Sequence, residues 1–185
     1  MILYLLDNVG HSFSARSISN YLKQENRKVS AETILNYIKA CCDAYLFMKL
    51  RREDLQGKKI LSVNEKYYSV DHGLREYILG SNTRNIDQVL ENIVCMELLR
   101  RGYTVTIGKN GEKEIDFIAS KNKDKLYIQV TYLLAGSETI EREFGIYDSI
   151  RDHYPKYVLS LDEFDMSRNG IKHLNIRDFL LSKEF

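Results

Sequence analysis

The sequence predicts a mixed α/β protein, because the spacing of its apolar residues changes from a helical to a strand period along the chain. Helical spacing dominates up to about residue 42, a hairpin pattern follows, and strands then alternate with helices. We expect three helices and a two-stranded hairpin in residues 1–80. Residues 81–185 should follow the order α, β, β, β, α, β, α, which gives a central mixed sheet flanked by helices.

The composition is that of a globular protein. The 185 residues are 44% hydrophobic and 29% charged, and the net charge of +1 favours no class of partner. Three cysteines are too few for a disulfide scaffold and suit reduced thiols in the cytoplasm. The apolar start, residues 1–6, is too short to span a membrane, so we expect a cytoplasmic protein without a membrane partner.

The front half shows the element order of a winged helix. Ser14 and Ser30 can cap the second and third helices. The third helix has an apolar stripe of Ile34, Tyr37, Ile38 and Cys41. Residues 45–50, 60–63 and 66–70 read as strands, with residues 51–59 as the hairpin loop. Three helices followed by a hairpin are typical of this helix-turn-helix variant.

A small polar stretch, residues 80–83, is the best candidate for a domain boundary. It divides the chain into a winged-helix domain, residues 1–80, and a second domain, residues 81–185. The first segment holds 12 Lys and Arg against 9 Asp and Glu, and the second holds 15 against 17. The front half is therefore mildly basic and the back half mildly acidic.

Duplex DNA is the partner expected for the front half, through the third helix and the hairpin. Cations at an exposed hairpin tip can reach the phosphates beside a helix in the major groove. The candidate DNA-binding residues are Arg51, Arg52, Lys58 and Lys59 of the hairpin and Lys39 of the third helix. The alternative is a solvated hairpin on a winged helix that docks protein instead of DNA.

The back half contains clear element boundaries. Residues 86–100 read as a helix that Gly102 ends, and Asn110-Gly111 predicts a tight hairpin between two strands. Residues 115–117 and 126–130 alternate as strands, residues 137–150 suit a helix, residues 157–161 suit a buried strand, and residues 176–181 suit a closing helix.

Three polar residues of the back half form a candidate metal site. Glu91 lies on an apolar helix stripe, where a lone carboxylate is costly unless it has a partner. If the strands of Asp116 and Gln129 pair, these two side chains converge, and Glu91 can reach them from the helix above. Converging oxygen donors suit Mg²⁺, which can activate water for phosphoryl chemistry. The alternative is an ion-pair or hydrogen-bond cluster that holds the helix to the sheet.

Several motifs, in order along the chain, resemble the AAA-type ATPases of bacteria and archaea that carry a C-terminal domain of unknown function. The matching segments are residues 66–75 (KYYSVDHGLR), 91–94 (ENIV), 97–103 (ELLRRGY), 114–118 (EIDFI), 128–130 (IQV) and 141–143 (ERE). The resemblance covers the chain from the winged helix onward. Within the last motif, we expect Glu141, Arg142 and Glu143 to form an internal salt-bridge set, with a phosphate contact of Arg142 as the alternative.

The resemblance implies a PD-(D/E)XK, restriction-endonuclease-like fold for residues 81–185. In that superfamily a helix Glu, a strand Asp and an acid-x-Lys pair act together, and the matching positions here are Glu91, Asp116, Gln129 and Thr131. Gln129 thus replaces a carboxylate and Thr131 replaces the lysine. Lys113 or Lys125 could replace the missing lysine from a different position in the chain. The alternative is that both lie in solvated turns. We therefore expect weak or absent cleavage.

The resemblance also implies an ATPase module as a partner, in the same chain or in another. No P-loop occurs in the sequence, because both Gly-Lys pairs, at residues 57–58 and 108–109, lack the required flanking residues. The sequence therefore leaves three functions open. The first is a nucleic-acid-binding module with a degenerate nuclease-like site that serves an ATPase. The second is an active Mg²⁺-dependent DNA nuclease, and the third is a domain that holds partner proteins or forms a homo-oligomer.

Overall fold

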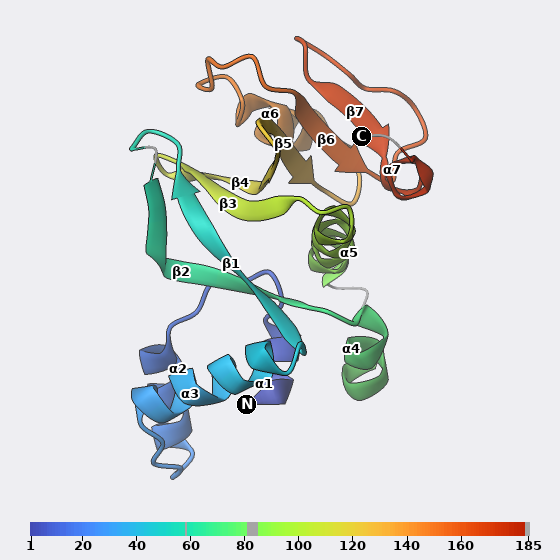
Figure 1. The fold of residues 1–185 in the computed structure, drawn as a ribbon. Coiled ribbons are helices and arrows are strands. Elements are labelled where there is room, and N and C mark those ends of the chain that lie inside the picture. The colour runs from blue at the N-terminus through green and yellow to red at the C-terminus, as the bar shows by residue number, and fades with distance from the viewer. Residues whose placement is uncertain (58, 81–84, 184–185) are drawn as a thin grey trace.

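One continuous sheet organises the computed structural model, which describes residues 1–57, 59–80 and 85–183 (Figure 1). Within these residues, seven strands lie in the order β2-β1-β3-β4-β5-β6-β7. Parallel and antiparallel neighbours both occur, so the predicted central mixed sheet is confirmed. The strands are β1 (Phe47–Asp54), β2 (Lys59–Ser69), β3 (Thr104–Asn110), β4 (Lys113–Lys121), β5 (Asp124–Val130), β6 (Lys156–Ser160) and β7 (Lys172–Asn175).

Helices flank this sheet, as the sequence predicts. Ser14 accepts a hydrogen bond from the Ser17 N–H and Ser30 accepts one from the Thr33 N–H, so both predicted caps are confirmed. No described helix is both long and apolar enough to cross a membrane. The helices are α1 (Ile2–Asp7), α2 (Ala15–Gln24), α3 (Ala31–Asp43), α4 (His72–Leu79), α5 (Ile86–Arg100), α6 (Ser137–Gly145) and α7 (Ile176–Leu181).

The hairpin of the front half is built into the central sheet. Strand β1 pairs with β2 on one side, and its last residues, Arg52 to Asp54, pair in parallel with Ile107 to Lys109 of β3. The expected loop over residues 51–59 is therefore wrong, because pairing with β3 keeps most of that segment in strand conformation. The order of three helices and a hairpin is the predicted one. The hairpin does not project as a free wing, however, and the winged-helix assignment stays a prediction.

The main hydrophobic core draws on both predicted domains. Leu5, Ile34 and Phe47 of the front half belong to the same buried cluster as Val94 and Phe179 of the back half. A shared core and a shared sheet join the two segments through their packing. Most of the proposed boundary lies outside the described residues, which omit residues 81–84, and the division at residue 80 stays a prediction.

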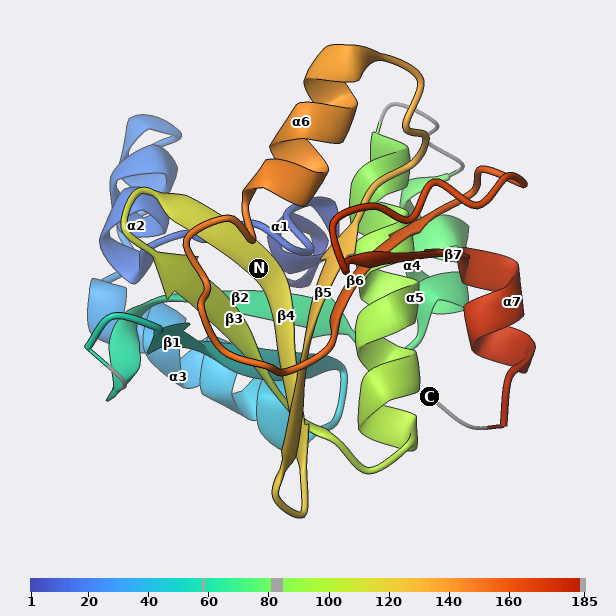
Figure 2. The ribbon, with the colours of Figure 1, turned by 90° about the horizontal axis from the view of Figure 1, so that it is seen from above.

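A second buried cluster lies on the other side of β4 and β5. It joins Ile115, Ile118 and Tyr127 of these strands to Phe144 and Tyr147 of the α6 region. The main core contacts the opposite side, where α5 packs. Figure 2 shows α5 and α6 beside these strands. The two helices therefore cover two different faces of the sheet at this point.

Several elements differ from the sequence prediction. Helix α4 was not expected; Asp71 begins it by accepting a hydrogen bond from the Leu74 N–H. Strand β7 was also not expected, since four residues are too few to show an alternating pattern. Helix α6 ends at Gly145 instead of continuing to about residue 150. On α3, Tyr37 is exposed, so the buried stripe is narrower than predicted.

Candidate functional site

An irregularity in β4 determines where Asp116 points. Thr106 pairs with Ile118 and Gly108 pairs with Ile115, so Ile107 alone lies opposite both Asp116 and Phe117. This extra residue is a β-bulge, which breaks the alternation of side chains along the strand. Ile115 consequently joins the α6-side cluster while Phe117 joins the α5-side core. The regular alternation expected for residues 115–117, which would place Ile115 and Phe117 on one face, is wrong for this reason.

Asp116 lies at the point where β4 and β5 separate. The regular pairing of these strands ends at Phe117 and Ile128. Beyond it, the Val130 N–H donates to Oδ2 of Asp116 at 2.8 Å, and the Asp116 N–H donates to Oε1 of Gln129 at 3.2 Å. Side chains thus replace the backbone ladder here. The structure brings Asp116 and Gln129 into contact through the Asp116 backbone N–H, while the Asp116 carboxylate bonds to the Val130 N–H.

Glu91 approaches from α5 on the side of the main core. The Tyr68 hydroxyl donates to its Oε2 at 3.3 Å, and the Lys66 Nζ lies 4.0 Å from the same oxygen. Gly10, at φ +76°, lies against this carboxylate, because a Cβ at residue 10 would come within 3.2 Å of Oε2. Only a residue without a side chain fits there comfortably.

Lys66 is a site residue that the sequence analysis did not single out. It lies on β2, its side chain is only 9% exposed, and it pairs with Glu114 of β4 as well as with Glu91. Lys66 and Tyr68 are two positions apart on β2 and both reach Glu91, so strand alternation turns them to the same face. A lysine on the buried face of a strand was the available signal.

Burial and neighbouring carboxylates raise the pKa values of both carboxyls. Desolvation raises the pKa of Glu91 to about 7, although the Lys66 charge acts in the opposite direction. Desolvation and the neighbouring Glu91 charge raise the pKa of Asp116 well above its usual range. Burial alone would lower the pKa of Lys66, but Glu91 and Glu114 outweigh it and raise that pKa. The cluster therefore keeps a charged ammonium beside carboxyl groups that tend to hold protons.

Arg52 belongs to this polar cluster and is not an exposed hairpin cation. Its guanidinium pairs with Glu114, its Nε donates to the Asn64 carbonyl at 2.8 Å, and its side chain is 15% exposed. The expectation of an outward-facing Arg52 is wrong, because the hairpin is part of the sheet and Glu114 lies within reach across it.

The other predicted DNA-binding residues are on the surface or outside the described residues. Arg51 and Lys59 are exposed. Lys39 is exposed and pairs with Asp43 at 2.5 Å, one turn further along α3. Lys58 lies outside the described residues. Among the described hairpin residues 51–57 and 59, Arg51 and Lys59 are thus the cations available to a phosphate backbone.

The suggested substitutes for the missing lysine do not lie at the carboxylates. Lys125 is at the opposite end of β5 from Gln129 and pairs with Glu53 at 2.6 Å. Lys113 donates to the Gly145 carbonyl at the end of α6, at 3.3 Å. Thr131 is buried. The nearby cation is therefore Lys66, which comes from the front half of the chain.

The possible metal ligands at the site, Asp116, Glu91 and Gln129, are carboxylate or amide oxygens, which Mg²⁺ and Mn²⁺ prefer. Among the residues that the structure describes, however, no group of three or more Asp, Glu, His or Cys side chains is close enough to hold a metal ion. A cation at Asp116 would therefore depend on the amide oxygen of Gln129 and on water for part of its coordination sphere.

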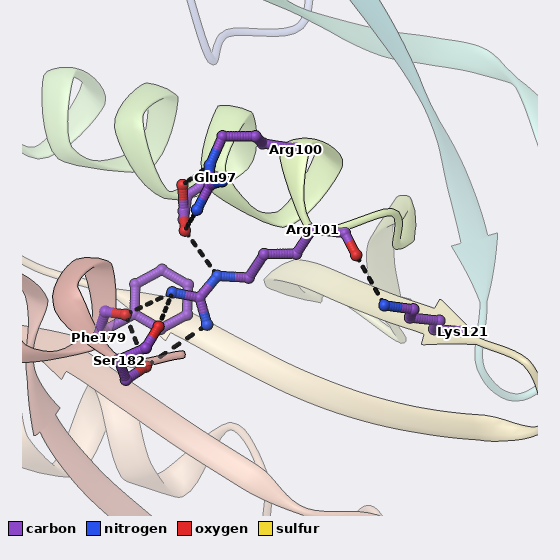
Figure 3. Close-up of polar contacts among 6 residues, drawn as sticks. All are labelled: Glu97, Arg100, Arg101, Lys121, Phe179 and Ser182. Carbon is purple, nitrogen blue, oxygen red and sulfur yellow. Dashed lines mark hydrogen bonds and ion pairs between the residues drawn. The ribbon is translucent and has the colours of Figure 1, made fainter. Parts of the chain in front are cut away.

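The end of α5 carries a second polar cluster, and its role is structural (Figure 3). Glu97 accepts hydrogen bonds from Arg100 and from the Nε of Arg101 at 2.6 Å. Arg101 also donates to the Phe179 carbonyl at 2.7 Å and to the Ser182 carbonyl at 3.0 Å, and its guanidinium lies over the Phe179 ring. These contacts join α5 to α7 and fix the end of the helix that carries Glu91.

Comparison with known proteins finds relatives that are themselves uncharacterized. The chain is 40% identical over 182 residues to an uncharacterized protein of Haemophilus influenzae. The aligned region covers 98% of this chain and 45% of that protein. The chain is also 35% identical over 154 residues to an uncharacterized protein of Methanocaldococcus jannaschii. This aligned region covers 80% of the chain and 33% of that protein. The chain thus spans less than half the length of these relatives. No family model and no solved structure matches it.

Proposed function

We propose that this chain is a nucleic-acid-binding module with a nuclease-like site of weak activity. The observation that carries the proposal is the position of Lys66, a buried cation whose ammonium lies 4.0 Å from Glu91 in the cluster that also contains Asp116. Phosphodiester chemistry needs oxygen donors for a cation together with positive charge near the phosphate. The cluster contains both, although Gln129 and Thr131 depart from the pattern expected for a nuclease.

Asp116 would hold Mg²⁺ together with Gln129, and Glu91 would assist from the α5 side. When bound, Mg²⁺ lowers the pKa of a coordinated water and offsets the charge that develops on a phosphoryl group. The chain's own residues set the limits of that chemistry. Gln129 brings no charge, and the Lys66 charge is shared with Glu114, so less of it is available to a phosphate. We therefore expect slow cleavage.

The role beside an ATPase is part of the same proposal. The relatives are more than twice as long as the region that matches this chain, which leaves room for a further domain in them. That length supports a module that works together with another domain or chain.

A cleavage assay with matched variants tests the nuclease-like site. Labelled single-stranded and duplex DNA would be incubated with the wild type, Asp116→Asn and Asp124→Asn, with Mg²⁺ or with EDTA. Asp124 is an exposed carboxylate at the start of β5 and serves as the control. We expect slow, Mg²⁺-dependent cleavage that Asp116→Asn abolishes and Asp124→Asn retains. Cleavage that survives Asp116→Asn, or wild-type protein that binds neither DNA, would overturn the proposal.

A specific observation favours protein docking as the second candidate function. Helix α3 exposes Leu35 (55%) and Tyr37 (52%) on either side of its buried stripe, and Tyr45 follows on the surface just after the helix. A helix that reads a major groove would instead present polar and basic side chains there. Lys39 is the basic residue of α3, and it is already paired with Asp43.

A further inference from the structure

Glu143 on α6 is a buried carboxylate with one unsatisfied oxygen. Its side chain is only 4% exposed, and its paired oxygen, Oε1, lies 2.7 Å from the Arg142 guanidinium. The predicted salt bridge within residues 141–143 is thus confirmed for this pair. The other oxygen, Oε2, is buried without a hydrogen-bond partner among the described residues. Burial of such an atom is normally destabilising, and more so for a charged group.

The surroundings of Glu143 place it beside the Asp116 site. The α6 region packs on β4 and β5 from the side opposite α5, through Phe144, Tyr147 and Tyr127. Gln129 lies two residues after Tyr127 on β5, so strand alternation directs its amide to this same side. Asp116 lies next to Gln129 at the bulge, where the two residues are hydrogen-bonded.

Glu143 and Asp116 also interact electrostatically. The negative charge of Glu143 contributes to the raised pKa of Asp116, after the larger effects of burial and Glu91. Burial raises the pKa of Tyr147, and both Asp116 and Glu143 add to that increase. Lys66 compensates Glu91 on the α5 side, whereas Arg142, whose side chain is 70% exposed, is the cation paired with Glu143 on the α6 side.

We propose that Glu143 is a ligand of a divalent cation, Mg²⁺ or Mn²⁺, which it holds together with Asp116 and Gln129 on the α6 side of the sheet. The site deepens the proposed function and rests on it, because Asp116 is common to both. Glu143 supplies the negative charge that Gln129 lacks, and a cation supplies the partner that the free Oε2 lacks. Hard cations with oxygen ligands match this donor set.

Direct measurement of Mn²⁺ binding tests this site without reference to activity. Free Mn²⁺ would be followed by electron paramagnetic resonance during titration of the full chain. The variants are Glu143→Gln, Glu141→Gln, Asp116→Asn and Glu91→Gln. Glu141 lies two residues before Glu143 and is exposed, so its variant is the matched control. We expect Glu143→Gln and Asp116→Asn to weaken Mn²⁺ binding at least about tenfold, and Glu141→Gln to leave it unchanged.

Folding is controlled by circular dichroism and by thermal unfolding with EDTA. Glu143→Gln removes a buried charge and should unfold at or above the wild-type temperature in EDTA. Mg²⁺ should raise the unfolding temperature of the wild type and of Glu141→Gln, but not that of Glu143→Gln. If Glu143→Gln is unfolded, Glu143→Asp, which shortens the side chain by one methylene, should weaken Mn²⁺ binding in the same direction.

The outcomes separate this inference from the proposed function. Wild-type affinity in Glu143→Gln together with loss of binding in Asp116→Asn would overturn the role of Glu143 and leave the predicted metal site in place. Loss of binding in Glu91→Gln but not in Glu143→Gln would place the cation on the α5 side. Absence of Mn²⁺ binding by the wild type at about 1 mM would overturn the cation site entirely, while DNA binding would still be judged by its own assay.

Discussion

The ammonium of Lys66 lies 4.0 Å from Oε2 of Glu91, and it joins the hairpin of the front half to the helix that carries the candidate site. Lys66 also pairs with Glu114 on β4. One buried cation therefore connects β2, α5 and β4, which are far apart in the sequence. Because the group is almost fully enclosed, its loss would leave Glu91 without a compensating cation in a poorly solvated environment, whereas Glu114 would keep Arg52.

Replacing Lys66 by Met should strongly destabilise the protein. Removal of one partner from a buried ion pair typically costs about 3–5 kcal/mol, because the remaining charge is buried alone. The loss should be smaller at about pH 5 than at about pH 8, since Glu91 can take up a proton at the lower pH. Urea unfolding of the wild type and Lys66→Met at the two pH values measures both effects.

Lys49→Met is the matched control for that experiment. Lys49 lies on β1 and pairs with Glu65 at 3.2 Å, but its side chain is 39% exposed. Exposed pairs contribute about 0–1 kcal/mol, so this variant should lose little stability at either pH. Equal losses in the two variants would show that Lys66 does not compensate a buried charge.

Glu91→Gln should change how stability depends on pH. The folded pKa of Glu91 is raised to about 7 from the ordinary value of 4.5, so the folded state binds the proton more tightly than the unfolded state. The resulting stability is fully present below about pH 4.5 and is lost as the pH rises through about 7. Relative to the wild type, the free energy of unfolding of Glu91→Gln should rise by up to about 3 kcal/mol between about pH 5 and pH 8.

Unfolding in EDTA at these two pH values provides the measurement, because it removes any contribution from bound metal. Glu138→Gln, at an exposed position in the first turn of α6, should follow the wild type. A wild-type pH dependence in Glu91→Gln would mean that Lys66 already keeps this carboxylate ionised in the folded protein.

Local patterns predicted much of the fold, and tertiary contacts decided the rest. Helix α5 begins and ends at the predicted residues because its periodicity is long and Gly102, at φ +83°, ends it. The proximity of Asp116 and Gln129 was predicted from strand alternation on the condition that their strands pair, which they do. The bulge at Asp116 did not, because one extra residue in a strand leaves no mark in a hydrophobic pattern. Lys66 was missed because its partners, Glu91 and Glu114, come from distant segments.

Replacing Arg101 by Ala should release α7 from α5. Arg101 bonds to Glu97 and to two carbonyls of the α7 region, and it covers the Phe179 ring (Figure 3). We expect a loss of about 2–4 kcal/mol and faster amide exchange in residues 176–181. Arg100→Ala is the control, because its side chain is 71% exposed and it pairs with the same Glu97. A similar loss in both variants would contradict a clamping role for Arg101.

His173 should make the protein less stable in acid. Burial lowers the pKa of His173, outweighing the opposite effects of Asp162 and Asp165. Its Nδ1 accepts a hydrogen bond from the Met166 N–H at 3.2 Å, and its Nε2 lies 2.8 Å from the Ser160 hydroxyl. A neutral ring satisfies both contacts. The stability it contributes is present above about pH 6.5 and is lost as the pH falls through the lower folded pKa.

A comparison of two histidine variants isolates this effect. His173→Gln should be less stable than the wild type at about pH 7, by about 1–2 kcal/mol, and the difference should shrink by about pH 5. His153→Gln, at an exposed position, should show the wild-type dependence. A difference for His173→Gln that stays constant over this range would show that the pKa of His173 is the same in the folded and unfolded states.

The hairpin cations provide the sharpest test between DNA binding and protein docking. Arg51 and Lys59 are exposed, whereas Arg52 is held by Glu114, so Arg51→Ala with Lys59→Ala removes surface charge without disturbing the buried cluster. Each lost phosphate contact should flatten the dependence of log affinity on log salt by about 0.9, or about 1.8 for both. Duplex binding across a salt series measures this slope.

Lys123→Ala with Lys172→Ala is the control double variant, since both residues are exposed and lie in the β4–β5 turn and on β7, away from the hairpin. It has the same change in net charge and should keep the wild-type slope if the hairpin is the contact. Equal slopes in all three proteins would exclude Arg51 and Lys59 as phosphate contacts. The exposed Leu35 and Tyr37 of α3 would then mark the functional surface of the front half. The double variant Leu35→Ser with Tyr37→Ser should impair binding to a protein partner. It should leave cation binding at Asp116 unchanged.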